Sequence, residues 1–129
     1  KLDSRVQVQQ PLGFHDYNWL QMNAFAVVSD SGTLPEESSF YASIGKPISA
    51  VCIRTSTERP EAIDKACFIL SGIDTKGLLQ SVDLAVQMTK DGNHGIPVPS
   101  YTDDVSNKVV KIIQSYVGVV NKMVWRKEI

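Results

Sequence analysis

The sequence predicts an α/β fold, in which a parallel sheet carries helices on both of its faces. Four β-type runs lie near residues 4–9, 25–29, 48–54 and 67–70, and each is followed by a segment with helical signals. Alternating strands and helices are typical of parallel sheets, because parallel neighbours are joined by crossover helices. Such sheets bind ligands outside the carboxyl ends of their strands, so binding residues are expected in the turns that follow these runs.

Overall composition narrows the class of protein. The chain has 129 residues, 43% of them hydrophobic and 21% charged, which is enough for one compact domain over residues 1–129. Its net charge of −1 and the lack of a basic run argue against a nucleic-acid partner. No hydrophobic run approaches the roughly 20 residues that cross a membrane, so we expect no membrane partner. The cytoplasm is the expected compartment.

Neither the cysteines nor the histidines form a metal-binding pattern. Cys52 and Cys67 lie in β-type runs, where the common outcome is a reduced thiol in the core. Two cysteines and two histidines without close spacing make no metal site, and we expect no cofactor. The chain begins at Lys1 without a methionine and runs straight into a β-type segment, so we expect it to be part of a longer protein.

Helices are predicted from caps and from the spacing of hydrophobic residues. Asp16 is a candidate cap for a short helix, and residues 91–99 are a loop because glycine and proline are frequent there. The last helix carries one hydrophobic stripe along its length. The predicted helices cover about residues 17–23, 35–44, 60–65, 75–89 and 103–125.

The turn after the second β-type run has the features of an anion site. Ser31 and Gly32 are small turn residues, and Thr33 has the three-residue spacing to Glu36 of a capping box. Free backbone N–H groups and the positive end of a helix dipole favour phosphate at such a junction. Glu37 lies one turn into the helix, within reach of hydroxyl groups on a phosphate-bearing ligand. An ordinary β-turn-α junction with a good cap accounts for the same residues.

A second turn is expected beside the first. Residues 54–59 follow the next strand along the chain, and successive parallel strands place their carboxyl ends side by side. Arg59 would then lie near Ser31 and Glu37. It would either strengthen a phosphate site or form an ion pair with Glu37 that only fixes the loop. The two roles are compatible, because an arginine can hold a carboxylate in place for a ligand.

The two turns carry motifs whose order and spacing are specific. They read DSGTLPEE at residues 30–37 and RTSTERPE at residues 54–61, and together they resemble the non-hydrolysing UDP-N-acetylglucosamine 2-epimerase family. The resemblance runs from about residue 11 to the C-terminus. It implies the two-lobed GT-B architecture, with two Rossmann-like halves and the active site between them. Residues 1–129 would then be an incomplete, UDP-binding C-terminal lobe that lacks its N-terminal lobe, and the complete protein would be a homodimer.

By the same resemblance, several residues have UDP-binding roles. Leu12 stands where relatives can carry a polar uracil contact, so only its backbone could serve, and Thr33 stands where many relatives have a second glycine. The implied roles are phosphate contact for Ser31, Gly32 and Thr33, ribose contact for Glu37, uracil stacking for Tyr17, completion of the pocket for Arg59, and a weaker contact for Leu12.

The reaction that the resemblance implies inverts C2 of a UDP-N-acetylhexosamine, by elimination of UDP and its re-addition. Such an isomerase supplies precursors for bacterial-type surface polysaccharides, as in capsule or O-antigen synthesis. Its acid and base groups lie in the other lobe, so we expect no catalytic residue in this chain and no activity from it alone. The substrate stays open between a gluco and a 6-deoxy-talo sugar.

Two other functions remain open from the sequence. One is the donor-nucleotide lobe of a GT-B glycosyltransferase, and the other is a non-catalytic module that binds nucleotide sugars. The run TERPE at residues 57–61 favours the epimerase.

Overall fold

The computed structural model describes residues 2–101 and 104–128. Within them, three strands form one parallel sheet in the order β1-β2-β3. Val51 in the centre pairs with Val28 on one side and with Ile69 on the other. The strands are β1 (Val27–Ser29), β2 (Ala50–Cys52) and β3 (Ile69–Leu70), shorter than the predicted runs. The predicted α/β fold with a parallel sheet is confirmed.

Helices connect consecutive strands, as the alternating pattern predicts. A crossover helix lets the next strand run parallel to the previous one. The helices are α1 (Phe14–Asn23), α2 (Leu34–Ser43), α3 (Pro60–Asp64), α4 (Thr75–Lys90) and α5 (Val105–Met123), with a 3₁₀ turn, η1 (Pro99–Tyr101), before α5.

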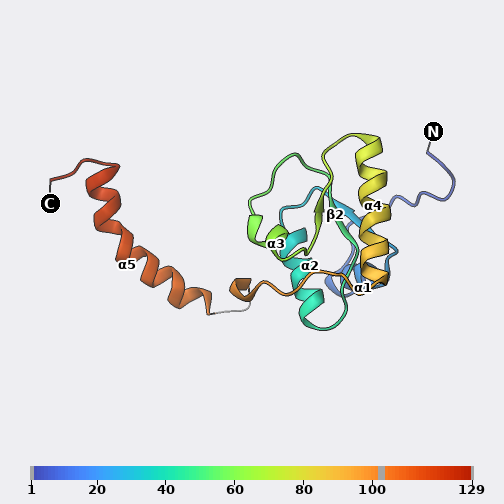
Figure 1. Cartoon of the computed structure of the whole chain (residues 1–129), viewed down its shortest axis with the longest axis horizontal. Coiled ribbons are helices and arrows are strands. Elements are labelled where there is room, and N and C mark those ends of the chain that lie inside the picture. Colours follow the sequence, from blue (N-terminus) through green and yellow to red (C-terminus); the bar gives the residue numbers. More distant parts are fainter. Residues whose placement is uncertain (1, 102–103, 129) are drawn as a thin grey trace. The chain divides into compact units, whose positions relative to one another are not determined.

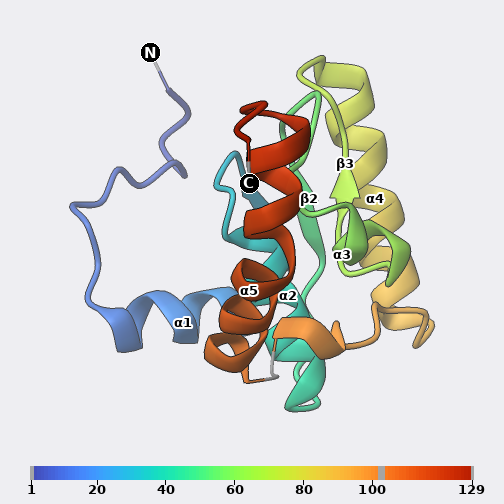
Figure 2. The same cartoon turned by 90° about the vertical axis from the view of Figure 1, so that its left-hand side faces the viewer.

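The sheet is covered on both sides. Figure 1 places β2 between α4 on one side and α2 and α3 on the other, and Figure 2 shows α4 running along β2 and β3. Val51 in the central strand has no exposed surface, and Leu34 and Tyr41 of α2 are 1% exposed. A strand buried on both faces is typical of a parallel sheet between helix layers. This packing fixes the two turns that leave the carboxyl ends of β1 and β2.

The predicted first strand, residues 4–9, is wrong. The three-stranded sheet leaves this segment unpaired, and it is irregular after a turn at residues 4–5. Val6 and Val8 are 52% and 83% exposed, so the apolar residues of the alternating run are not buried against the rest of the protein. An alternating run forms a strand only where a neighbour pairs with it, and the described residues provide none here.

The start of α1 also differs from the prediction. The N-cap is Gly13 in extended backbone, and the Tyr17 N–H donates to the Gly13 carbonyl at 3.0 Å. Asp16 therefore lies inside the first turn, where its charge suits the helix dipole without capping it. The helix begins at the residue after Gly13 because the ψ angle of Gly13, 159°, is extended and not helical.

Both cysteines are buried and reduced, as predicted. Burial raises the pKa of each thiol, so Cys52 and Cys67 stay protonated at neutral pH. None of the helices in the described ranges has the length and hydrophobicity needed to cross a membrane.

The chain divides into two units, residues 1–97 and 98–129. The second contains α5, whose first turn is capped by the Asp104 carboxylate accepting from the Asn107 N–H. The predicted start of this helix at residue 103 lies outside the described residues. The predicted hydrophobic stripe is present and exposed, at Val109, Ile113 and Val117 among others. A single lobe over residues 1–129 stays a prediction.

Candidate functional site

The turn between β1 and α2 is held by its own hydroxyl groups. The Ser29 Oγ accepts from the Ser31 N–H at 3.0 Å, and the Ser31 Oγ accepts from the Thr33 N–H at 3.2 Å. Short side-chain-to-backbone bonds of this kind replace helix or strand pairing in tight turns. These bonds hold the backbone of the turn in one conformation at the carboxyl edge of the sheet.

Thr33 is the N-cap of α2, as predicted, but the capping box does not form. Its side chain caps no backbone N–H and instead lies 3.1 Å from the Glu37 Oε1. A carboxylate only accepts, so the Thr33 hydroxyl donates to Glu37. The Ser31 hydroxyl, 2.9 Å from that of Thr33, then donates to Thr33. A chain of hydroxyl groups therefore connects the turn to Glu37.

The start of α2 presents open backbone donors. Within the described part of the chain, the N–H groups of Gly32 and Glu36 have no hydrogen-bond acceptor. Pro35, in the first helical turn, has no N–H to offer. Open N–H groups at the positive end of a helix are the usual setting for a phosphate.

The second turn lies beside the first, as predicted, but Arg59 has a different partner. Its Nε donates to the Glu36 Oε1 at 2.6 Å, and its Nη1 donates to the Glu58 carbonyl at 3.3 Å. The alternative of an ion pair between Arg59 and Glu37 is therefore wrong. Successive helical residues point about 100° apart, so Glu36 turns toward the second turn while Glu37 turns toward α1. Both members of the pair remain about one third exposed.

Arg54, which is not among the predicted site residues, also faces the first turn. Both of its terminal nitrogens donate to the Glu58 carboxylate, at 2.9 and 2.7 Å, and this pairing lowers the pKa of Glu58. A Cβ added to Gly32 would lie 3.8 Å from the Arg54 Nη1 and 4.0 Å from the Glu58 Oε2. Arg54 belongs to the same sequence motif as Arg59. The motif does not show that its side chain points toward the first turn, because that direction depends on the fold.

Glu37 is held by uncharged donors. Its Oε1 accepts from Thr33 at 3.1 Å, and its Oε2 accepts from the Gln21 Nε2 at 3.0 Å and the Tyr17 hydroxyl at 3.5 Å. Among the described residues, no cation forms an ion pair with Glu37. Its negative charge is therefore available to a further donor.

A pocket of about 350 Å³ opens between α1 and α2 beside Glu37. Burial raises the pKa of Tyr17 and of Tyr41, and the nearby charge of Glu37 raises both further. The Tyr41 hydroxyl donates to the Asn18 Oδ1 at 2.5 Å, and this bond joins two residues that line the pocket. Its size falls within the range of small-ligand sites. The lining residues are Phe14, Tyr17, Asn18, Glu36, Glu37, Phe40 and Tyr41.

The structure brings together most of the predicted site residues. Tyr17, Thr33 and Glu37 form one hydrogen-bonded group, which continues to Ser31, the residue before Gly32. Arg59 is bonded to Glu36, the residue next to Glu37. Leu12 precedes α1 and has no described hydrogen bond to the group. Gln21 was missed, because a single glutamine in a helix gives no sequence signal of its contacts.

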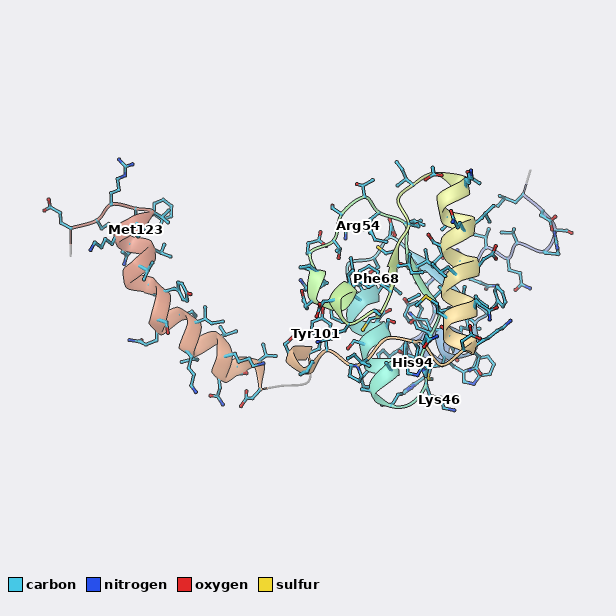
Figure 3. The ribbon with its side chains drawn as sticks, in the orientation of Figure 1. Lys46, Arg54, Phe68, His94, Tyr101 and Met123 are labelled. Atoms are coloured by element: carbon cyan, nitrogen blue, oxygen red, sulfur yellow. The ribbon has the colours of Figure 1, made fainter. Side chains whose placement is uncertain are left out.

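A smaller cavity of about 190 Å³ lies at the other end of the strands, next to Cys67 and His94. Figure 3 shows Arg54 and His94 at opposite ends of the sheet unit. Chain packing is tight there, since a Cβ on Gly95 would come within 2.5 Å of the Cys67 Cα. The hydrogen-bonding groups of the first turn and its pocket therefore remain the candidate site.

Comparison with known proteins gives the family. Residues 1–114 match the sequence model described as UDP-N-acetylglucosamine 2-epimerase. A UDP-N-acetylglucosamine 2-epimerase of Methanococcus maripaludis is 30% identical over 97 residues, covering 70% of this chain and 25% of that protein. The Escherichia coli K12 relative of the same name is 32% identical over 83 residues, covering 64% of this chain and 20% of that protein.

A solved structure agrees. The UDP-N-acetylglucosamine 2-epimerase from Rickettsia bellii superposes with a TM-score of 0.64 at 38% identity, covering 92% of this chain and 32% of that one. The chain thus spans about a fifth to a third of the length of these relatives. Because the family match extends over well more than half of its residues, the chain belongs to the UDP-N-acetylglucosamine 2-epimerase family.

Proposed function

We propose that the chain is the UDP-binding C-terminal lobe of an epimerase that inverts C2 of a UDP-N-acetylhexosamine. The observation that carries the proposal is Glu37, a carboxylate held only by uncharged donors, close along the chain to the open backbone N–H groups of Gly32 and Glu36. That pairing suits a ligand with a diphosphate on one side and a vicinal diol on the other. A ribonucleoside diphosphate has both.

The phosphate contacts in this proposal come from the first turn. The N–H groups of Gly32 and Glu36 point out of the start of α2, and the hydroxyls of Ser31 and Thr33 lie next to them. Arg59 supplies positive charge from the neighbouring turn while it holds Glu36. Charge develops on UDP as it leaves the sugar, so preorganised donors here lower the barrier of the elimination step.

The nucleoside contacts come from the pocket between α1 and α2. Glu37 accepts from the ribose hydroxyls, and the half-exposed Tyr17 ring stacks on the uracil. The backbone of Leu12 is a weaker contact to the base. The groups that remove and return the C2 proton belong, in this proposal, to a further lobe that completes the active site. The complete enzyme would work as a cytoplasmic homodimer in the synthesis of surface polysaccharide precursors.

Binding of UDP is tested by titration into the intact protein while amide NMR signals are followed. We expect the largest shifts at Ser31, Gly32 and Thr33, because the Gly32 amide and the hydroxyls of Ser31 and Thr33 would contact the diphosphate. Shifts confined to residues 92–97, at the other end of the strands, would place the ligand elsewhere.

Activity is tested by incubating the complete protein, including the further lobe that completes the active site, with UDP-N-acetylglucosamine in D₂O. Proton removal and return at C2 should place solvent deuterium on that carbon in both epimers, which NMR detects directly. A glycosyltransferase leaves C2 protonated and unchanged, so transfer of the sugar without deuterium would favour the donor-lobe alternative. Binding of the nucleotide sugar with neither reaction would favour a non-catalytic module.

A further inference from the structure

Gln21 is a buried polar side chain that the proposed function does not use. It projects from α1 and is only 6% exposed. Its Nε2 donates to the Glu37 Oε2, whereas its Oε1 is buried without a partner in the described part of the chain. An unpaired buried amide oxygen is destabilising, and a hydrocarbon side chain of the same length would avoid it. The bond to Glu37 therefore has to account for a polar side chain at this position.

The two consecutive carboxylates of α2 show what Gln21 provides. Glu36 is paired with the guanidinium of Arg59, which neutralises its charge. Glu37 is oriented by the Gln21 amide and the Thr33 hydroxyl, which carry no charge. A carboxylate oriented in this way keeps its full strength as an acceptor for ligand hydroxyls.

The hydrogen bonds of Glu37 can be counted oxygen by oxygen. A carboxylate offers about four acceptor positions, two on each oxygen. The Oε1 uses one of its two acceptor positions for Thr33. The Oε2 uses both of its positions, for Gln21 at 3.0 Å and for Tyr17 at 3.5 Å. A vicinal diol that donates to both oxygens must therefore displace one donor from Oε2. The longest bond is that of Tyr17, which is at the limit of a hydrogen bond.

We propose that Gln21 is a positioning residue for recognition of the ribose diol. It holds the Glu37 carboxylate so that one position on each oxygen faces the ligand, once the Tyr17 hydroxyl has moved away. The Tyr17 ring is then released to stack on the base. This inference rests on the proposed function, since it assumes a ribonucleotide in the pocket.

The test is the Gln21→Met variant of the intact protein, measured by calorimetric titration with UDP and with 2′-deoxy-UDP. Methionine keeps the length and helix preference of glutamine but donates no hydrogen bond. UDP affinity should fall about fivefold, and 2′-deoxy-UDP affinity by about twofold or less, so that the preference for ribose shrinks. The midpoint of thermal unfolding without ligand should change little, because removal of the buried unpaired oxygen offsets the loss of the bond to Glu37.

A matched control is available on α4. The Gln87 Nε2 donates to both oxygens of Asp91, at 3.0 and 3.1 Å, so Gln87→Met removes the same kind of bond away from the pocket. It should leave both nucleotide affinities unchanged. Equal loss of both nucleotides in Gln21→Met with a lowered midpoint would make Gln21 part of the scaffold, and unchanged affinities would leave it without a role; either result overturns the inference while UDP binding stands. If the wild-type protein binds no UDP, the proposed function itself fails.

Discussion

Replacing Glu37 with glutamine is expected to lower UDP affinity about thirtyfold, or about 2 kcal/mol, the scale of hydrogen bonds to a charged group. Three donors converge on this carboxylate, from Thr33, Gln21 and Tyr17. A glutamine at this position has only one oxygen, so its NH₂ group would face at least one of those donors. The side chain must then turn, and the ribose hydroxyls lose their acceptor. Titration with UDP and 2′-deoxy-UDP should give nearly equal affinities in Glu37→Gln.

Glu36→Gln is the matched control for that result. It changes the adjacent residue of the same helix by the same group, but Glu36 pairs with Arg59 at 2.6 Å and has no bond to the Glu37 donors. We expect the preference for UDP over 2′-deoxy-UDP to be retained in this variant. If Glu36→Gln removes the preference and Glu37→Gln does not, the wrong carboxylate has been assigned to the ribose.

The proximity of the two turns could be predicted from the sequence because it depends on local signals. Turn residues after a β-type run, a threonine followed by a helix, and the order of strands all constrain neighbours along the chain. The N-cap at Thr33 and the proximity of the two turns follow from these signals and are confirmed. The predicted strand at residues 4–9 is wrong because a strand depends on contacts that are not local. A strand requires a partner, and alternation within one segment does not supply it.

The partners of individual side chains could not be predicted in this way. Whether Arg59 meets Glu36 or Glu37 depends on a rotation of about 100° around α2 and on the path of the second turn. Gln21 lies sixteen residues before Glu37, and their contact depends on how α1 packs on α2. The sequence therefore predicts which turns lie together, whereas the partner of each neighbouring carboxylate comes from tertiary packing.

The pairing of Arg59 with Glu36 gives a specific expectation for Arg59→Lys. The ion pair with Glu36 is partly exposed on both sides, and such pairs contribute roughly 0–1 kcal/mol, so the midpoint of unfolding without ligand should hardly change. UDP affinity should nevertheless fall about tenfold, or about 1.4 kcal/mol. Arginine presents its donors in a fixed plane and can bridge a carboxylate and a ligand oxygen, whereas the lysine ammonium is a single point charge.

The loss in Arg59→Lys should extend to turnover of the intact enzyme, because departing UDP carries more charge than the bound UDP-sugar and depends more on the guanidinium. Arg5→Lys is the control, since Arg5 also pairs with a carboxylate, Asp3, but is exposed near the N-terminus. It should change neither UDP affinity nor turnover. Wild-type UDP affinity in Arg59→Lys, together with a lowered midpoint, would instead assign the Arg59–Glu36 pair to stabilising the junction of the two turns. The phosphates would then depend on the backbone N–H groups of α2 and the hydroxyls of Ser31 and Thr33 alone.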